Sequence, residues 1–295
     1  MTVQAHVMPH WRDTSGLSPH LVFGSDVALR TRWFVPASFQ HPAKLHLGLL
    51  HWLIERHTLP GETIADPMAG SGGILYAASL QRHVIAREIE PHWIELMREN
   101  AAHITAHAGL FAGYIDQADA RQPWGYTADH ILFSPPYGCE VSTTPNSNRG
   151  LRYRLRTAQI SSGTRWSRFL DQPNQGSLGM LAFYYGTHPA QIGHLRGKCY
   201  WQAMRLIYTQ AYAALRPHGH LILVVKDHIR DGKRVTTAAT ARAVCEELGF
   251  ALHAHYQRHL HNLSLWQRRR KERGEPVVEE EDVLVFKRCN ISRTW

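Results

Sequence analysis

Short apolar runs alternate with amphipathic segments along two stretches of the chain, about residues 38–137 and 197–288. The apolar runs predict strands that end at Asp66 and Glu88, and further strands over 113–116, 130–133, 220–226, 250–257 and 283–287. Apolar residues at helical spacing predict a helix that opens at His41 and others over 74–80, 91–107, 200–215 and 236–248. This alternation predicts an α/β fold, a doubly wound, mostly parallel sheet of about seven strands with the last strand antiparallel.

Residues 138–196 interrupt this rhythm, since they are rich in Gly, Ser, Thr, Asn and Arg and show little periodicity. Six arginines lie in this segment with no acid between them: Arg149, Arg152, Arg154, Arg156, Arg165 and Arg168. Tyrosine, tryptophan and phenylalanine are interleaved with the arginines, a composition that suits backbone phosphates and stacked bases. The segment is therefore predicted to recognise nucleic acid, and a disordered insertion with merely solvated charges is the alternative.

The charge balance points to the same class of partner. Lys and Arg number 33 against 24 Asp and Glu, which gives a formal net charge of +9. An excess of positive charge favours a polyanionic partner, although a generally basic surface would produce the same balance. The four cysteines are far apart, which predicts free thiols in a reducing compartment and no metal site. No apolar run reaches membrane-spanning length and no signal peptide is visible, so a cytoplasmic protein without a membrane partner is expected.

A glycine-rich turn stands between the first of these strands and the helix that follows it. Its residues are small or conformationally special: Asp66, Pro67, Met68, Ala69, Gly70, Ser71, Gly72. A strand, a glycine-rich turn and a helix start allow backbone N–H groups to approach a ligand closely, although a ligand-free crossover would look similar. The turn lacks the G-x-G-x-x-G spacing of pyrophosphate-binding loops.

Three acids follow three consecutive predicted strands: Asp66, Glu88 and Asp119. Glu88 is placed to bind ribose hydroxyls, because an acid about 20 residues beyond a glycine loop does so in nucleotide-binding folds. Asp119 could accept from an exocyclic amine of adenine, and Asp66 could meet a positively charged group of the same ligand. Ile89 and Ala120, which follow two of these acids, are expected to join the site.

The fourth strand end carries Ser134-Pro135-Pro136-Tyr137. Two consecutive prolines remove two N–H donors and leave carbonyl groups and the Ser134 hydroxyl as acceptors. Tyr137 offers a ring for stacking. Such a group would hold the –NH2 of a planar base and direct its lone pair at an electrophile, whereas in isolation the same tetrapeptide would be a rigid turn.

These residues resemble the amino-methyltransferases of DNA, which use S-adenosylmethionine. D-P-M-A-G-S-G-G resembles their D-P-F-x-G-x-G-T cofactor loop, and S-P-P-Y resembles their catalytic [DNS]-P-P-[YFW] tetrapeptide. His41-Pro42-Ala43-Lys44 resembles the segment that precedes the loop, which implies that His41, Pro42 and Lys44 also contact the cofactor. The resemblance covers about residues 38–137 and 197–288 and implies a Rossmann-like class I methyltransferase fold.

The predicted elements, the composition and this resemblance together divide the chain into four parts. These are an extended arm (1–38), the cofactor-binding and catalytic half of the methyltransferase domain (39–137), an inserted target-recognition segment (138–196) and the second half of the domain (197–295). A serine at the first catalytic position implies N4 of cytosine in double-stranded DNA as the acceptor, in a specific sequence. N6 of adenine, guanine N2 of RNA and a catalytically silent binding protein remain alternatives. A cognate restriction endonuclease is a partner that the resemblance allows, and no metal is needed.

Overall fold

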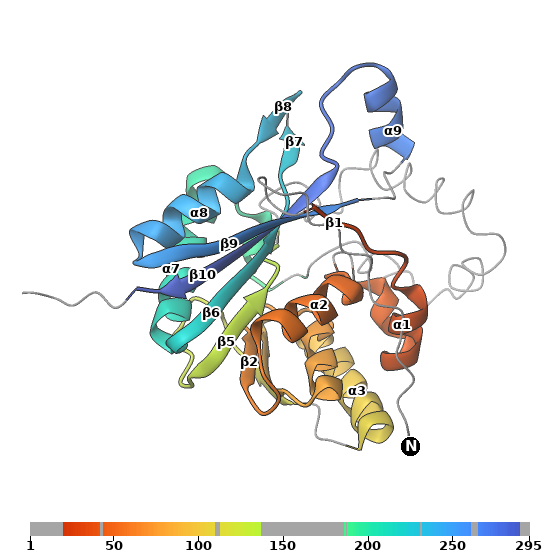
Figure 1. The fold of residues 1–295 in the computed structure, drawn as a ribbon, viewed down its shortest axis with the longest axis vertical. Helices are drawn as coiled ribbons and strands as arrows, with labels where there is room; N and C mark the ends of the chain where they lie inside the picture. Colours follow the sequence, from red (N-terminus) through yellow and green to blue (C-terminus); the bar gives the residue numbers. More distant parts are fainter. Residues whose placement is uncertain are drawn as a thin grey trace, which may run out of the picture.

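The structure is a computed structural model, and it describes residues 20–41, 44–109, 113–136, 186, 188–230, 232–260 and 265–289. Its central feature is an eight-stranded sheet in the order β1-β9-β10-β6-β5-β2-β3-β4 (Figure 1). The strands are β1 (His20–Leu21), β2 (Thr63–Asp66), β3 (His83–Glu88), β4 (Tyr114–Gln117), β5 (Ala128–Phe133), β6 (Leu215–Val225), β9 (Phe250–His259) and β10 (Glu280–Arg288).

Strand pairing confirms the predicted doubly wound α/β fold. The pairs β2–β3, β2–β5, β3–β4 and β5–β6 are parallel. β10 runs antiparallel to both β6 and β9, as predicted for the last strand. Because β2 lies at the centre, with β3 on one side and β5 on the other, the chain reverses direction across the sheet there. A ligand crevice is expected beyond the carboxyl ends of the strands at such a point.

Two layers of helices cover the sheet (Figure 1). One face carries α1 (Val27–Trp33), α2 (Leu47–His57), α3 (Pro91–Ala108) and the 3-10 helix η2 (Gly73–Leu80). The other carries α7 (Gly197–Ala214) and α8 (Thr237–Glu247). Side chains alternate along β5, since Leu132 packs under the first layer and Phe133 under the second. The remaining described elements are η1 (Pro36–Gln40), η4 (Ile192–His194), the hairpin β7 (His228–Arg230) and β8 (Lys233–Val235), and α9 (Leu265–Glu272).

The helix predicted to open at His41 begins at Leu47 instead. His46 is its N-cap, with an extended backbone and a ring nitrogen that accepts from the N–H of Leu49. The carboxylate of Asp26 accepts from the N–H of Leu47 and binds Arg30 of α1. The helix start is therefore decided by a residue 21 positions away in the chain.

Other boundaries also differ from the sequence expectation. The described part of the predicted extended arm contains β1 and α1, and α1 packs against α3. The segment after the glycine loop is a 3-10 helix rather than an α-helix, and it ends where Gln81 adopts φ 65°. Between the predicted strands over 250–257 and 283–287, for which the sequence predicts no helix, the structure places α9, which contains the basic residues around Arg270. β6 begins at Leu215, five residues before the strand that the sequence predicts over 220–226.

Candidate cofactor and acceptor site

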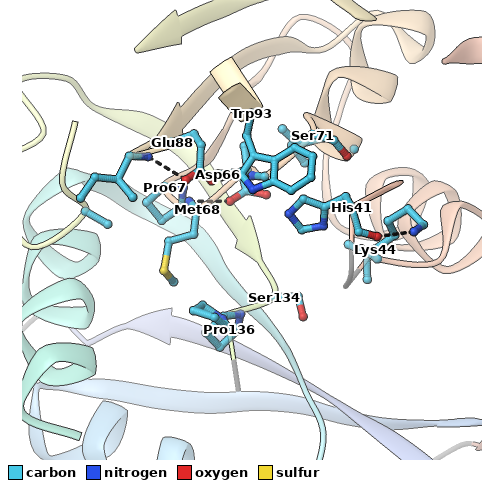
Figure 2. Close-up of a pocket in the computed structure, with 18 of the residues that line it drawn as sticks. His41, Lys44, Asp66, Pro67, Met68, Ser71, Glu88, Trp93, Ser134 and Pro136 are labelled. Carbon is cyan, nitrogen blue, oxygen red and sulfur yellow. Dashed lines mark hydrogen bonds between the residues drawn. The ribbon is translucent and has the colours of Figure 1, made fainter. Parts of the chain in front are cut away.

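A cavity of about 350 Å³ opens at the carboxyl ends of the central strands (Figure 2). It is lined by fifteen of the residues that the sequence predicts for the site: His41, Lys44, Asp66, Pro67, Met68, Ala69, Gly70, Ser71, Glu88, Ile89, Asp119, Ala120, Ser134, Pro135 and Pro136. A volume of this order is typical of small-molecule sites. The tertiary structure thus brings segments separated by more than ninety residues around one space.

Some predicted site residues are not placed in this cavity. Gly72 does not line it, because a Cβ at that position would lie 2.6 Å from Cγ of Met97, which shows that its α-carbon faces α3. Pro42 and Tyr137 lie outside the described residues. So do the six arginines that the sequence predicts to bind nucleic acid: Arg149, Arg152, Arg154, Arg156, Arg165 and Arg168.

The glycine-rich turn approaches the cavity closely because its backbone adopts left-handed conformations. Gly70 has φ 55° and Gly72 has φ 84°, a region that L side chains enter only with strain. A Cβ at Gly70 would lie 2.5 Å from Nε2 of His41, whose ring packs edge-on against Trp93 with centroids 4.5 Å apart. Glycine is therefore required at position 70 by both conformation and space.

Asp66 is a buried carboxyl group that has no counter-ion within the part of the chain that the structure describes. Its side chain accepts one hydrogen bond, from the N–H of Met68 at 2.9 Å. The residue is 8% exposed. Burial, together with the nearby charge of Glu88, raises the pKa of Asp66 to about 8. Such a group is suited to a positively charged ligand, which would restore its ionised form.

Glu88 organises the glycine-rich turn from the end of β3. One carboxylate oxygen accepts from the N–H of Gly70 at 2.8 Å, and the other accepts from the N–H groups of Ile89 and Glu90 at 2.8 and 3.0 Å. Burial raises the pKa of Glu88, although these backbone hydrogen bonds oppose the shift. The side chain lines the cavity and so reaches both the turn and a ligand.

Asp119 stands in a different electrostatic environment. Arg121 contacts both of its carboxylate oxygens, through Nε at 3.0 Å and through a terminal nitrogen at 2.6 Å. Burial would raise the pKa of Asp119, but the hydrogen bonds and charge of Arg121 outweigh burial and lower it. Asp119 is therefore ionised at neutral pH and retains acceptor capacity toward the cavity.

The Ser134-Pro135-Pro136 segment follows β5 directly and faces the same cavity. Figure 2 shows Ser134 and Pro136 across the pocket from Glu88 and Trp93. The hydroxyl of Tyr200, on α7, donates to the carbonyl oxygen of Pro136 at 2.8 Å. Helix α7, which covers the face of the sheet away from α1, α2 and α3, thereby holds the Ser134-Pro135-Pro136 segment.

Several residues that the sequence reasoning did not assign to the site line the cavity as well. They include Trp93, Gln191, Ile192, Lys226, Arg258 and Glu281. Trp93 lies in the first turn of α3, shortly after β3 ends at Glu88. Its position just beyond a strand end would have allowed its place in the cavity to be predicted from the sequence. Lys226 directly follows the end of β6, and Asp66 is the last residue of β2, so a search of every strand end would have found Lys226. Arg258 and Glu281 carried no local signal, because strand pairing alone brings them there.

No family model matches the chain. A curated relative, the tRNA (guanine(10)-N2)-dimethyltransferase of Methanothermobacter thermautotrophicus, is 33% identical over 93 residues. The match covers 31% of this chain and 26% of the relative, so the chain spans about a quarter of the length of the curated relative that it matches.

Solved structures of methyltransferases resemble the chain more distantly. TrmN from Thermus thermophilus overlays with a TM-score of 0.45 and 19% identity, over 83% of this chain and 49% of that one. The glycopeptide N-methyltransferase MtfA, solved with sinefungin, overlays with a TM-score of 0.46 and 12% identity, over 81% and 85%. Similarity at this level bears on neither the substrate nor the residues of the site.

Two further structural observations concern the described residues alone. They contain no group of three or more His, Cys, Asp or Glu side chains placed to hold a metal ion. None of their helices combines the length and the apolar character that a membrane crossing requires.

Proposed function

We propose that the protein transfers a methyl group from S-adenosylmethionine to an exocyclic amine of a base in RNA, with N2 of guanine in tRNA as the acceptor. The observation that carries this proposal is the single cavity that joins Ser134 and Pro135 to the acids at the ends of β2, β3 and β4. The 93-residue similarity to a tRNA guanine-N2 enzyme supports the choice of RNA and of guanine.

The residues present fit S-adenosylmethionine. Asp66, a buried carboxyl without a counter-ion among the described residues, suits the positively charged amino-acid and sulfonium portion. Glu88 suits the ribose hydroxyls, and Asp119 suits the exocyclic amine of the adenine. Trp93 and Ile89 supply apolar surface at the same end of the cavity. The cofactor supplies an electrophilic methyl group when bound.

The tetrapeptide then holds the acceptor. The Ser134 hydroxyl oxygen and the Pro135 carbonyl oxygen each accept a hydrogen bond from one N–H group of the amine. These two hydrogen bonds draw the nitrogen lone pair out of conjugation with the ring. The amine becomes acidic once it is methylated, so its extra proton passes to water and no strong base is required in the tetrapeptide. Tyr137, which lies outside the described residues, is proposed to stack on the base, a contact worth about 1–3 kcal/mol.

N4 of cytosine in double-stranded DNA is the second candidate acceptor. Ser134 at the first position of the tetrapeptide and the His41-Pro42-Ala43-Lys44 segment favour it, since both resemble the DNA enzymes. Under this reading the target base must leave the duplex, at a cost of about a few kcal/mol. A cognate restriction endonuclease would then be a partner.

Nucleoside analysis separates the two candidates. The purified protein is incubated with labelled S-adenosylmethionine and either tRNA or duplex DNA, and the digested products are identified by mass spectrometry. N2-methylguanosine from tRNA supports the proposal. N4-methylcytosine from DNA would replace it with the second candidate, and no transfer to either polymer would overturn both.

A further inference from the structure

Three charged residues form a row across the carboxyl end of the sheet, beyond the part of the cavity assigned to the cofactor. β10 pairs with β6 so that Val225 lies opposite Asp282, which places Lys226 opposite Glu281. β10 pairs with β9 so that Glu281 lies opposite Arg258. All three charged residues line the cavity. The row therefore alternates in sign, with a positive, a negative and a positive group.

The row lies on the same face of the sheet as the catalytic tetrapeptide. Leu132 of β5 pairs with Ile222 of β6, and both pack under the α2 layer. Side chains alternate along strands, so Ser134, two residues after Leu132, shares that face with Val224 and Lys226. An acceptor base gripped by Ser134 would thus face the side of the cavity that carries Lys226 and Glu281.

Two polar groups in the row, one carboxylate oxygen of Glu281 and the ammonium of Lys226, have no hydrogen-bond partner in the described part of the chain. Arg258 donates to Oε2 of Glu281 through Nε and a terminal nitrogen, each at 2.7 Å, and the two side chains are 14% and 9% exposed. Oε1 of Glu281 and the ammonium of Lys226 make no such bond there. Burial, in part offset by Glu281, lowers the pKa of Lys226. Charged groups are costly to bury, and groups placed in this way commonly serve a ligand.

We propose that Lys226 and Glu281 select guanine as the acceptor base, an inference that rests on the proposed function. Next to its N2 amine, guanine presents one donor, N1–H, and one acceptor, O6. Oε1 of Glu281 accepts from N1–H, and the ammonium of Lys226 donates to O6. Arg258 holds Glu281 ionised and in place through the opposite oxygen.

The same pair disfavours the other bases. Cytosine presents only acceptors, N3 and O2, beside its amine, and adenine presents N1. A carboxylate facing such an acceptor is repelled, and its buried charge remains unpaired. The Lys226–Glu281 pair therefore supplies a specificity that Ser134 and Pro135, which grip any –NH2 group, do not.

The test uses an RNA that carries either guanine or 2-aminopurine at the methylated position mapped for the wild type. 2-Aminopurine keeps the N2 amine but has an acceptor at N1 and no O6. We expect the wild type to methylate it about 10²-fold more slowly than guanine. Glu281→Gln should lower kcat/KM for guanine about 10- to 100-fold. The kcat/KM values for guanine and 2-aminopurine should then differ by no more than about tenfold, because the amide of the new side chain can donate to N1 of 2-aminopurine.

Lys226→Met provides an independent arm. It should slow the methylation of guanine about tenfold and leave the methylation rate of 2-aminopurine unchanged, since only guanine has O6. Glu280→Gln is the matched control, because Glu280 lies one position along β10 and so on the opposite face, and it should match the wild type. Cofactor affinity, measured by calorimetry, checks that each variant is folded.

The outcomes separate the two levels of inference. The ratio of kcat/KM for guanine to kcat/KM for 2-aminopurine is the deciding quantity. If both Glu281→Gln and Lys226→Met keep the wild-type ratio, the role of the pair is overturned and guanine methylation still stands. A wild-type enzyme that forms N4-methylcytosine in DNA overturns the proposed function and the selection of guanine together.

Discussion

The hydroxyl of Tyr200 donates a hydrogen bond to the carbonyl oxygen of Pro136 at 2.8 Å. Tyr200 is 4% exposed and lies in the first turn of α7, so its ring is held by the core. Pro136 has no N–H, and its carbonyl is one of the few groups through which the fold can hold the tetrapeptide. A helix residue 64 positions further along the chain thus holds the segment proposed to be catalytic.

Tyr200→Phe should therefore misplace the tetrapeptide without unfolding the protein. Loss of one neutral hydrogen bond corresponds to about 0.5–1.5 kcal/mol, so kcat is expected to fall about two- to tenfold. The affinity for S-adenosylmethionine should stay at the wild-type value. Single-turnover kinetics and calorimetry measure the two quantities, and an unchanged rate would show that α7 does not position the segment.

Ser134→Ala tests the chemical step itself. The variant should bind cofactor normally and lose about 10²–10³ in turnover, by analogy with the removal of one positioned oxyanion-hole donor. Single-turnover methylation with saturating cofactor gives the rate. Full turnover in the variant would remove Ser134 from the catalytic group.

Asp66 predicts the pH dependence of cofactor binding. Its pKa is about 8 in the free protein, so the group is largely protonated at pH 7, whereas a cationic ligand requires the carboxylate. Binding should therefore release close to one proton, and affinity should rise about tenfold from pH 6 to pH 7. Calorimetry in buffers of different ionisation enthalpy counts the proton. Asp66→Asn should bind more weakly and release none, and proton release that persists in this variant would assign it to another group.

The glycine-rich turn offers a matched pair of substitutions. Gly70→Ala places a Cβ 2.5 Å from the His41 ring at φ 55°, where the backbone alone costs about 1–2 kcal/mol. We expect a lower Tm and weaker cofactor binding. At Gly73, which also lines the cavity, an added Cβ meets no heavy atom of the protein within 4 Å, so Gly73→Ala should leave the Tm unchanged or slightly raised. Equal effects of the two changes on the Tm in thermal unfolding would contradict this account.

A cluster of histidines at the opposite end of the sheet predicts acid sensitivity. The ring of His220 lies 5.3–5.4 Å from the rings of His57, His130 and His253. Burial, together with neighbouring histidines and Arg56, lowers the pKa of His57 to about 3, and burial with neighbouring charges, His130 foremost, lowers that of His220 to about 4.

Between pH 6.5 and about 4 the unfolded chain therefore binds protons at these positions that the folded chain does not, so stability falls as the pH falls. The double variant His57→Gln/His220→Gln should show a smaller drop in Tm from pH 7 to pH 5 than the wild type. Asp66 titrates in both proteins, so its contribution cancels in the comparison. Parallel curves of Tm against pH for the two proteins would exclude the histidine cluster as the cause of the loss of stability at low pH.

The sequence by itself determined the order of strands and helices and the placement of acids at strand ends. Periodicity is a local property, and in a parallel sheet the carboxyl ends of the strands necessarily share one edge. Asp66, Glu88, Asp119 and Ser134 were therefore predictable as neighbours. Their different environments were not, because Asp119 pairs with Arg121 while Asp66 has no cation beside it in the described residues.

Contacts between distant segments decided the rest. The start of α2 depends on Asp26, and the need for glycine at position 70 depends on the ring of His41. Lys226 and Glu281 meet only because β6 and β10 pair in one register, and a shift of one residue would turn Glu281 to the other face. Register is set by the packing of both sheet faces at once, so the residues proposed to select the base were visible only in the tertiary structure.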